Sequence, residues 1–262
     1  MPQPPGPRGV VVAAPSSGAG KTTVTLALLR ALRDAGHRVA GGKCGPDYID
    51  PAFHAAACGV PSLTYDAWAM TPAALRHQAY GSEAELLVIE GAMGVLDGAG
   101  TASMGSAAQT AEILGLPLVL VIDVAKTGAS AVLPVAGLRA LHPEVPLAGV
   151  ILNRVASPRH ARTLEHAFAE LGVPILGQLP RDPDLTLPER HLGLVQASEH
   201  PALEAFLARV GGVLARNADV AAIAAACLPV TAGTKPPLLP PLGQRIAVAS
   251  DTAFAFAYPH IL

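Results

Sequence analysis

The stretch Ala14-Pro15-Ser16-Ser17-Gly18-Ala19-Gly20-Lys21-Thr22-Thr23 decides the fold. A short apolar run precedes it, and a helical pattern from Lys21 to about Asp34 follows it. Glycine at positions 18 and 20 lets backbone N–H groups turn toward phosphate oxygens, and the start of the following helix adds positive potential. The stretch therefore predicts a phosphate-binding loop for a nucleoside triphosphate.

Individual residues of this loop have predicted roles. The Lys21 ammonium neutralises β- and γ-phosphate oxygens, and the Thr22 hydroxyl is a ligand for Mg²⁺, so we expect ATP and Mg²⁺ at this site. The usual Gly-x4-Gly-Lys-Ser/Thr spacing would place a glycine where Pro15 stands. A purely structural turn is the competing interpretation, but such a turn does not need this sequence at the start of a helix. The residues expected to contact the nucleotide are Ser17, Gly18, Ala19, Gly20, Lys21, Thr22 and Thr23.

Short apolar runs recur along the chain with helical segments between them. Each run is nearly continuous rather than alternating, which is typical of strands covered by helices on both faces of a parallel sheet. The sequence thus predicts an α/β fold with a doubly wound, mostly parallel sheet. Its expected strands are Gly9 to Ala14, His37 to Gly41, Leu86 to Ile89, Leu118 to Ile122, Leu147 to Leu152 and Ile175 to Leu179.

Composition excludes several classes of protein. With 51% hydrophobic and 15% charged residues, the 262-residue chain can bury a full core, and a net charge of -2 gives no general attraction to nucleic acid or anionic lipid. The 3 cysteines lack metal-ligand spacing, and no stretch approaches the roughly 20 apolar residues that span a bilayer. We expect a cytoplasmic protein without a nucleic-acid or membrane partner.

Proline marks a predicted domain boundary. We expect a first domain over residues 1–228, a proline-rich linker over 229–243, and the truncated start of a second unit over 244–262. In that last segment, Arg245 to Ala249 is expected to form a strand and Ala253 to Tyr258 the start of a helix.

Two acidic segments follow predicted strands. In the first, Lys43-Cys-Gly-Pro-Asp-Tyr-Ile-Asp-Pro51, the carboxylates of Asp47 and Asp50 are candidates to hold Mg²⁺, although Asp in a proline-rich turn also occurs for turn geometry alone. In the second, an apolar run ends at Glu90, where phosphate-loop proteins carry an acidic residue that assists the metal. Asp97 lies in the loop beyond it, with loop capping as the alternative role.

Four motifs in this order closely resemble the cobyrinic or hydrogenobyrinic acid a,c-diamide synthase family. They are the phosphate loop, Lys43 to Pro51, Glu90-Gly-Ala-Met-Gly-Val-Leu-Asp-Gly98 and Leu187-Pro-Glu-Arg-His-Leu-Gly-Leu194. The resemblance implies a P-loop NTPase-like domain of the dethiobiotin-synthetase kind. It also implies an amidoligase of cobalamin biosynthesis that converts corrinoid carboxylates to amides through an acyl phosphate, with ammonia from glutamine. The end of the chain resembles that family's entry into its glutamine amidotransferase domain, the rest of which is missing.

The resemblance assigns further residues. Lys21, Asp47, Asp50 and Glu90 are expected to be catalytic, and the expected metal ligands are Thr22, Asp47 and Glu90. Asn153 is a candidate contact of adenine. A polycarboxylate substrate calls for cations, and the residues expected to bind it are Lys43, Tyr48, Asp97, Arg154, Arg190 and His191.

Other interpretations stay open. One is a switch-like P-loop ATPase of the partitioning type, which acts through nucleotide-dependent dimerisation, although such proteins carry a second lysine where this chain has Ser16. Others are a dethiobiotin-synthetase-like ligase and an inactive binding module. No cysteine lies in a setting for glutamine hydrolysis, so the chain alone is expected to be weakly active or inactive. The sequence leaves open the metal of the macrocycle, the order of the a and c amidations and the oligomeric state, a homodimer included.

Overall fold

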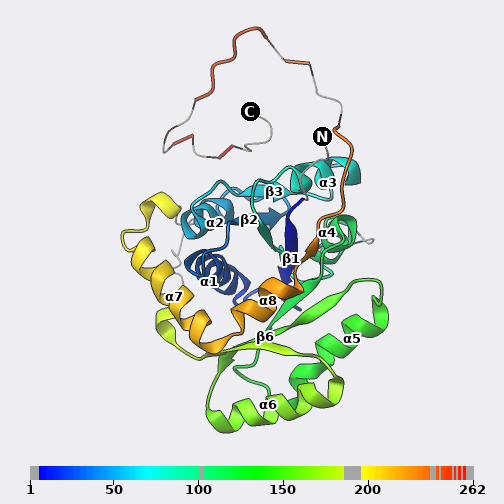
Figure 1. Cartoon of the computed structure of the whole chain (residues 1–262), viewed down its shortest axis with the longest axis vertical. Coiled ribbons are helices and arrows are strands. Elements are labelled where there is room, and N and C mark those ends of the chain that lie inside the picture. The colour runs from blue at the N-terminus through cyan, green and yellow to red at the C-terminus, as the bar shows by residue number, and fades with distance from the viewer. Residues whose placement is uncertain are drawn as a thin grey trace.

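The structure, a computed structural model, describes most of the chain. The described residues are 6–100, 103–185, 196–236, 240–241, 243–249, 251, 253–254 and 256–257. Figure 1 shows a sheet with helices on both sides, and the described residues after Thr231 lie away from the sheet.

The centre of the fold is a sheet with strand order β3-β2-β4-β1-β5-β6-β7, all pairs of which are parallel. The predicted doubly wound α/β fold is therefore confirmed. All six predicted strands are present, and none of their ends differs from the prediction by more than three residues. The bounds are β1 Arg8–Ala13, β2 Val39–Cys44, β3 Leu63–Tyr65, β4 Leu86–Glu90, β5 Leu118–Asp123, β6 Leu147–Val155, β7 Ile175–Pro180 and β8 Leu228–Pro229.

Two strands were not predicted. β3 has three residues and lies at the sheet edge, so it is too short for a period to be recognised. β8 pairs antiparallel with β1, where Leu228 lies opposite Gly9, at the boundary between the predicted first domain and the predicted linker.

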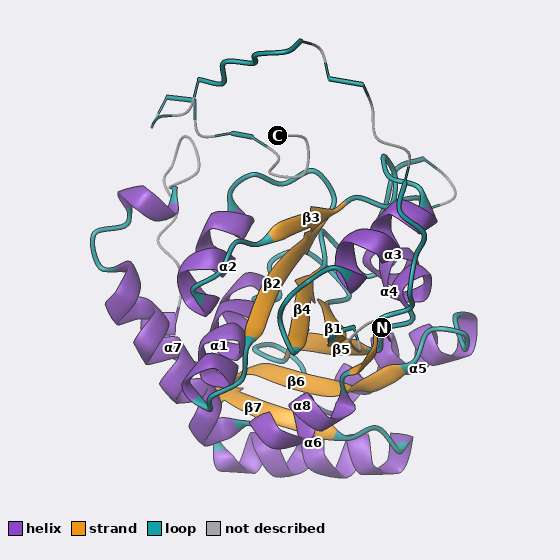
Figure 2. Ribbon diagram, turned by 45° about the horizontal axis from the view of Figure 1, so that its top comes forward, coloured by secondary structure: helices purple, strands orange, loops and turns teal. Residues whose placement is uncertain are grey.

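The helices divide into two layers, one on each face of the sheet, as Figure 2 illustrates. One buried cluster joins the sheet to α1, α2, α7 and α8, and the other joins it to α3, α4, α5 and α6. Successive residues of β1 alternate between them, with Val10 and Val12 in the first and Val11 and Ala13 in the second. The bounds are α1 Lys21–Asp34, α2 Asp50–Cys58, α3 Pro72–Tyr80, α4 Ala107–Leu114, α5 Leu133–Leu141, α6 Pro158–Leu171, α7 Leu203–Asn217 and α8 Val220–Ala226.

Helix ends follow the local sequence. Ser157 precedes α6, and its hydroxyl accepts a hydrogen bond from the His160 N–H at 3.2 Å. Gly172 ends the helix with a φ of 68°, a backbone conformation that glycine adopts without strain. Serine before the helix and glycine after it are thus the local signals for its two ends, and the predicted helix from Lys21 to Asp34 is confirmed.

The first residues of the predicted linker pack on the domain. The Val230 N–H donates to the Pro7 carbonyl at 2.9 Å, the Thr231 N–H donates to the Leu114 carbonyl at 3.0 Å, and Val230 is buried. The chain therefore stays attached to the domain through Thr231, and the division into 1–228, 229–243 and 244–262 stays a prediction.

The strand expected from Arg245 to Ala249 and the helix expected from Ala253 were wrong for the residues that the structure describes. Residues 243–249 are assigned to neither kind of element, and the same holds for the described residues after 250. A strand of this kind needs a partner, and in Figure 1 the segment lies apart from the sheet.

None of the helices in the described part of the chain has the length and apolar character needed to cross a bilayer.

The contacts of Val230 and β8 generate a test of where the folded domain ends. A chain that stops after Lys235 should unfold at the same denaturant concentration as the full chain. A chain that stops after Cys227 should lose at least about 2 kcal/mol of unfolding free energy, because a buried valine and its backbone hydrogen bonds are removed. Urea titrations followed by circular dichroism measure both, and equal stability of the two shortened chains would contradict this assignment.

Candidate nucleotide and phosphoryl-transfer site

The phosphate loop lies between β1 and α1, as the sequence predicts. Gly18 and Gly20 have φ angles of 77° and 91°, in the left-handed region that favours glycine. Gly20 is the N-cap of α1, and no side chain caps the helix there. The N–H groups of the first turn are thus left for an anion.

The loop has tight neighbours. The Asn153 side chain, which is buried, donates from Nδ2 to the Ala19 carbonyl at 2.9 Å, and a Cβ atom at position 20 would overlap that same Nδ2. The strand end of β6 therefore fixes the loop, and Asn153 contacts the loop backbone. Its predicted contact with adenine stays a prediction.

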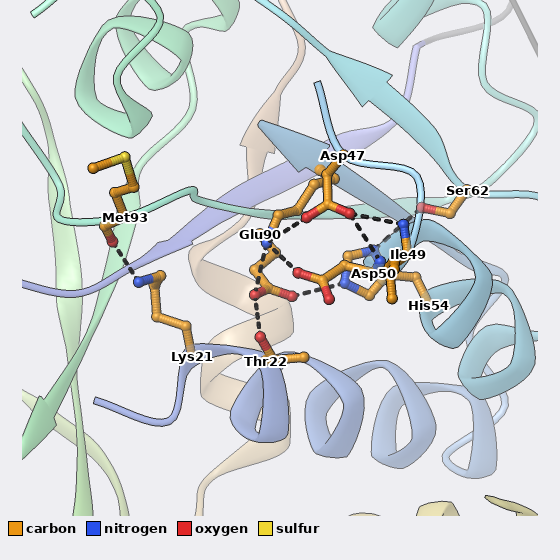
Figure 3. Close-up of polar contacts among 10 residues, drawn as sticks. Lys21, Thr22, Asp47, Ile49, Asp50, His54, Ser62, Glu90 and Met93 are labelled. Atoms are coloured by element: carbon orange, nitrogen blue, oxygen red, sulfur yellow. Dashed lines mark hydrogen bonds and ion pairs between the residues drawn. The ribbon is translucent and has the colours of Figure 1, made fainter. Parts of the chain in front are cut away.

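Lys21, at the start of α1, is buried and donates to the Met93 carbonyl (Figure 3). Burial lowers the pKa of this ammonium. Met93 itself has a φ of 50°, an uncommon value for a residue with a side chain. The loop after β4 is thus held directly against the phosphate loop, because the Val95 N–H also donates to the Ala14 carbonyl at 2.7 Å.

A charged cluster lies beside the phosphate loop, at the carboxyl ends of β2 and β4. The register of the two strands places Lys43 opposite Glu90. The Lys43 ammonium contacts the Asp50 carboxylate, and its Nζ lies 3.0 Å from Glu90 Oε1 and 3.7 Å from Asp47 Oδ2. The side chain of Lys43 is 6% exposed and that of Glu90 1% exposed, so the pair is removed from solvent.

The pKa shifts show which members of the cluster carry charge. Burial alone would raise the pKa of Glu90, but the nearby Lys43 and a hydrogen bond from His54 lower it well below its usual range. Burial likewise works against the charge of Lys43, yet the Glu90 and Asp50 carboxylates raise its pKa above the ordinary value. The pKa of Asp50 is raised, first by burial and then by repulsion from Glu90. Glu90 and Lys43 therefore form the charged pair, and Asp50 is the carboxyl group that protonates most readily.

Glu90 also joins the cluster to the phosphate loop. Its Oε1 accepts from the Thr22 hydroxyl at 2.6 Å, and its Oε2 lies 2.8 Å from His54 Nε2 (Figure 3). His54 was missed by the sequence interpretation. Its spacing from Asp50 could have indicated it, because a residue four positions after Asp50 on α2 lies on the same helix face as Asp50.

Asp47 has a structural role in addition to its place near Lys43. Its Oδ1 accepts from the N–H groups of Ile49 at 2.8 Å and Asp50 at 3.1 Å. Asp47 therefore stabilises the start of α2 and orients Asp50 toward the cluster. The turn role that the sequence offered as an alternative for Asp47 is present, and its role as a ligand of Mg²⁺ stays a prediction.

The residues predicted to bind substrate are not all brought together. Arg154 forms an ion pair with Asp123 at 2.6 Å and donates to the Gly18 carbonyl at 3.2 Å, so it lies beside the phosphate loop. Asp97 accepts from the Gly94 N–H at 2.8 Å, the loop-capping arrangement. Tyr48 is 40% exposed, and its ring lies 5.4 Å from that of Phe256. Arg190 and His191 lie outside the described residues.

A pocket of about 780 Å³ adjoins Arg154 at the carboxyl ends of β5, β6 and β7. Its size falls in the range of sites for small organic ligands. Its lining mixes charged side chains of both signs and includes Asp123, Lys126, Thr127, Arg154, Arg181 and Asp182.

The described residues contain no group of three or more His, Cys, Asp or Glu side chains arranged to hold a metal by themselves. Thr22 and Glu90 nevertheless present adjacent oxygen atoms, the type of donor that Mg²⁺ prefers. Mg²⁺ keeps several waters and commonly takes the rest of its ligands from phosphates, so two protein oxygens at a phosphate loop fit this ion. Asp47, whose oxygens serve α2 and Lys43, fits it less well.

Comparisons with known proteins agree with the fold and with the family resemblance. The family model described as "CobQ/CobB/MinD/ParA nucleotide binding domain" matches residues 10–195. Hydrogenobyrinate a,c-diamide synthases of Rhizobium meliloti and Brucella ovis are 50% and 51% identical over 97% of this chain, which confirms the resemblance inferred from the four motifs. The chain spans 59% of the length of each of these relatives. Among solved structures, chloroplast FtsY from Physcomitrella patens is similar in fold, with a TM-score of 0.50 and 15% identity over 78% of this chain and 65% of the other.

Of the three carboxylates in the cluster, Glu90 and Asp50 should respond differently to removal of their charge. Folding lowers the pKa of the Glu90 carboxylate, so this carboxylate contributes stability at pH 7 that is lost as the pH falls through the lowered pKa. Glu90→Gln removes that contribution. We expect Glu90→Gln to lose about 3 kcal/mol or more of unfolding free energy at pH 7, and less at pH 3.

Asp50→Asn provides the matched comparison. The pKa of Asp50 is raised by folding, so its ionised form disfavours the folded state above the usual carboxyl range, and this penalty disappears as the pH falls. We expect unfolding free energy at pH 7 to be unchanged, or higher by up to about 2 kcal/mol. Guanidinium titrations measure the unfolding free energy of both variants. If Asp50→Asn destabilises the chain as much as Glu90→Gln does, the assigned charges are contradicted.

Proposed function

Because this chain belongs to the CobQ/CobB/MinD/ParA nucleotide-binding domain family, we propose that it is the synthetase part of a corrinoid a,c-diamide synthase of cobalamin biosynthesis. In the reaction that we propose, ATP activates the a and c acetate carboxylates of hydrogenobyrinate or cobyrinate, and ammonia converts each to an amide. Support comes from the family match and from relatives at about half identity, both reported above.

The observation that carries the proposal is the Lys43–Glu90 pair beside the phosphate loop. A nucleotide-binding domain needs only the loop in order to bind its ligand. Here a second, buried lysine lies 3.0 Å from Glu90, and Glu90 accepts from Thr22 of the loop. In the proposed complex, this cation and this carboxylate would lie next to the terminal phosphate, where phosphoryl transfer needs charge stabilisation.

The proposed chemistry has two steps at each carboxylate. A carboxylate oxygen attacks the γ-phosphorus of ATP, the bond from that phosphorus to the β–γ bridging oxygen breaks, and ADP leaves. The product is an acyl phosphate. Ammonia then attacks the acyl carbon, the carbon–oxygen bond to phosphate breaks, and ammonia gives up a proton as the amide and inorganic phosphate form.

Residues of the chain have distinct tasks in these steps. Lys21 leaves the Met93 carbonyl for phosphate oxygens, and Lys43 supplies positive charge where the phosphoryl group is transferred. Asp50, which protonates more readily than Glu90, adjusts the net charge of the cluster when a polyanionic substrate arrives.

Mg²⁺ would be held through the hydroxyl oxygen of Thr22, while Glu90 accepts a hydrogen bond from that hydroxyl. When bound, this ion neutralises charge on the phosphate oxygens. The ATP base and ribose would occupy the pocket beside Arg154, which opens next to the phosphate loop.

The remaining assignments concern the substrate and its surroundings. We assign the corrinoid to the surface beside Lys43, Tyr48 and Asp97, and we propose that ammonia is supplied from glutamine by a second domain. The three cysteines of the chain are free and buried, which agrees with a reducing cytoplasm. A switch-like ATPase is not favoured, because the relatives reported above carry the name of an amidating enzyme.

Purified chain should release ADP from MgATP and ammonium when hydrogenobyrinic or cobyrinic acid is present, and each amidation should lower the corrinoid mass by about one dalton as OH is replaced by NH₂. Lys43→Met should abolish both signals while ATP still binds, because it removes the cation and keeps the side-chain length. A coupled assay measures ADP release, and mass spectrometry measures the mass of the corrinoid. If the chain is silent, the assay is repeated with a glutamine amidotransferase domain joined to it, and a second failure with both acids would contradict the proposed function.

A further inference from the structure

We propose that His54 is a positioning residue for the metal-side carboxylate: its Nε2–H holds Glu90 Oε2 and thereby directs Glu90 Oε1 toward Thr22. This inference rests on the proposed function only in taking the phosphate loop to bind a magnesium nucleotide. His54 is fully buried, so it cannot contact substrate itself.

The network around His54 fixes its hydrogen-bonding state. The ring has two nitrogens, of which Nε2 lies 2.8 Å from Glu90 Oε2 and Nδ1 lies 3.3 Å from the Ser62 hydroxyl oxygen. A carboxylate only accepts hydrogen bonds, so Nε2 must carry a proton and donate it in the hydrogen bond to Glu90 Oε2. The Ser62 hydroxyl pairs with Nδ1, so both nitrogens of the buried ring have a partner.

Glu90 needs this donor because its two oxygens face different groups. Oε1 accepts from Thr22 at 2.6 Å and from Lys43 at 3.0 Å, whereas Oε2 accepts from His54 at 2.8 Å. The carboxylate is fully buried, so water does not replace a lost donor. Without His54, rotation of the carboxylate toward Lys43 would satisfy Oε2 and withdraw Oε1 from Thr22.

The strand above His54 is shaped to admit the ring. A Cβ atom added to Gly41 of β2 would lie 2.7 Å from the Cβ of His54 and 3.2 Å from its Cγ. Gly41 is in a strand, where glycine otherwise weakens the sheet. The missing side chain at position 41 is what lets α2 approach closely enough for His54 to reach Glu90.

The arrangement gives β2, α2 and β4 a joint role at the metal side of the site. Groups that hold a metal-side ligand in place commonly change metal affinity 10- to 100-fold when they are removed. The effect expected from His54 is therefore on the metal-dependent part of nucleotide binding, and nucleotide affinity without metal should change little.

The test compares ATP affinity of the 262-residue chain in Mg²⁺ and in EDTA, measured by isothermal titration calorimetry. His54→Phe keeps an aromatic ring and removes the donor, and we expect the gain in affinity from Mg²⁺ to fall about 10-fold or more while affinity in EDTA stays within about twofold. His54→Gln carries an amide N–H that reaches about as far as Nε2, and it should retain most of the gain. Thr110→Val serves as the control. It removes a different buried hydrogen-bond donor, the hydroxyl that donates to the Ser106 carbonyl, and it should leave the gain in ATP affinity from Mg²⁺ unchanged.

Gly41→Ala provides a second route, because it displaces His54 without altering a polar group, and it should share the loss seen with His54→Phe. A full Mg²⁺ gain in folded His54→Phe or Gly41→Ala would overturn the inference, as would a glutamine variant no better than the phenylalanine variant. The readout does not involve the corrinoid, so failed amidation with normal Mg²⁺-dependent binding affects only the proposed function. An unaltered chain that gains no affinity from Mg²⁺ would overturn both.

Discussion

The site depends on the burial of one carboxylate, that of Glu90, at the end of a central strand. A buried carboxylate is costly unless hydrogen-bond donors and a positive charge surround it. Here the donors come from three other elements: Thr22 from α1, Lys43 from β2 and His54 from α2. The electrostatic requirement of a single side chain thus joins the phosphate loop to the segment that follows β2, and this junction turns a nucleotide-binding fold into a candidate phosphoryl-transfer site.

Close approach of these elements depends on small residues where side chains would collide. Gly20 leaves room for Asn153 above the phosphate loop, and Gly41 leaves room for His54 beneath β2. Gly94 lets the loop after β4 approach the phosphate loop, since a Cβ there would lie 2.8 Å from the Pro15 carbonyl oxygen. Backbone packing and charge placement are therefore linked, because the donors reach Glu90 only when the strands and helices lie this close.

Much of the fold followed from the sequence, because continuous apolar runs and explicit helix caps are local signals. The edge strand β3 was missed because three residues show no period, and β8 was missed because its pairing with β1 depends on a contact far along the chain. In the site, Lys21, Lys43 and Glu90 could be predicted from motifs. His54 could not be assigned so easily, since its role depends on how α2 packs against β4, and the contacts of Arg154 with Asp123 and the phosphate loop depend on the arrangement of β5 and β6.

If this site activates a carboxylate by phosphorylating it, one oxygen atom of that carboxylate must leave with the phosphate, and an oxygen-isotope experiment follows that atom. Hydrogenobyrinic or cobyrinic acid labelled with ¹⁸O in its acetate carboxylates is incubated with MgATP, ammonium and the enzyme, and the released inorganic phosphate is examined by mass spectrometry. We expect one ¹⁸O atom to be transferred to phosphate for each amide formed, since the carboxylate oxygen leaves with the phosphoryl group. Amide formation with phosphate that contains no ¹⁸O would exclude an acyl phosphate at this site.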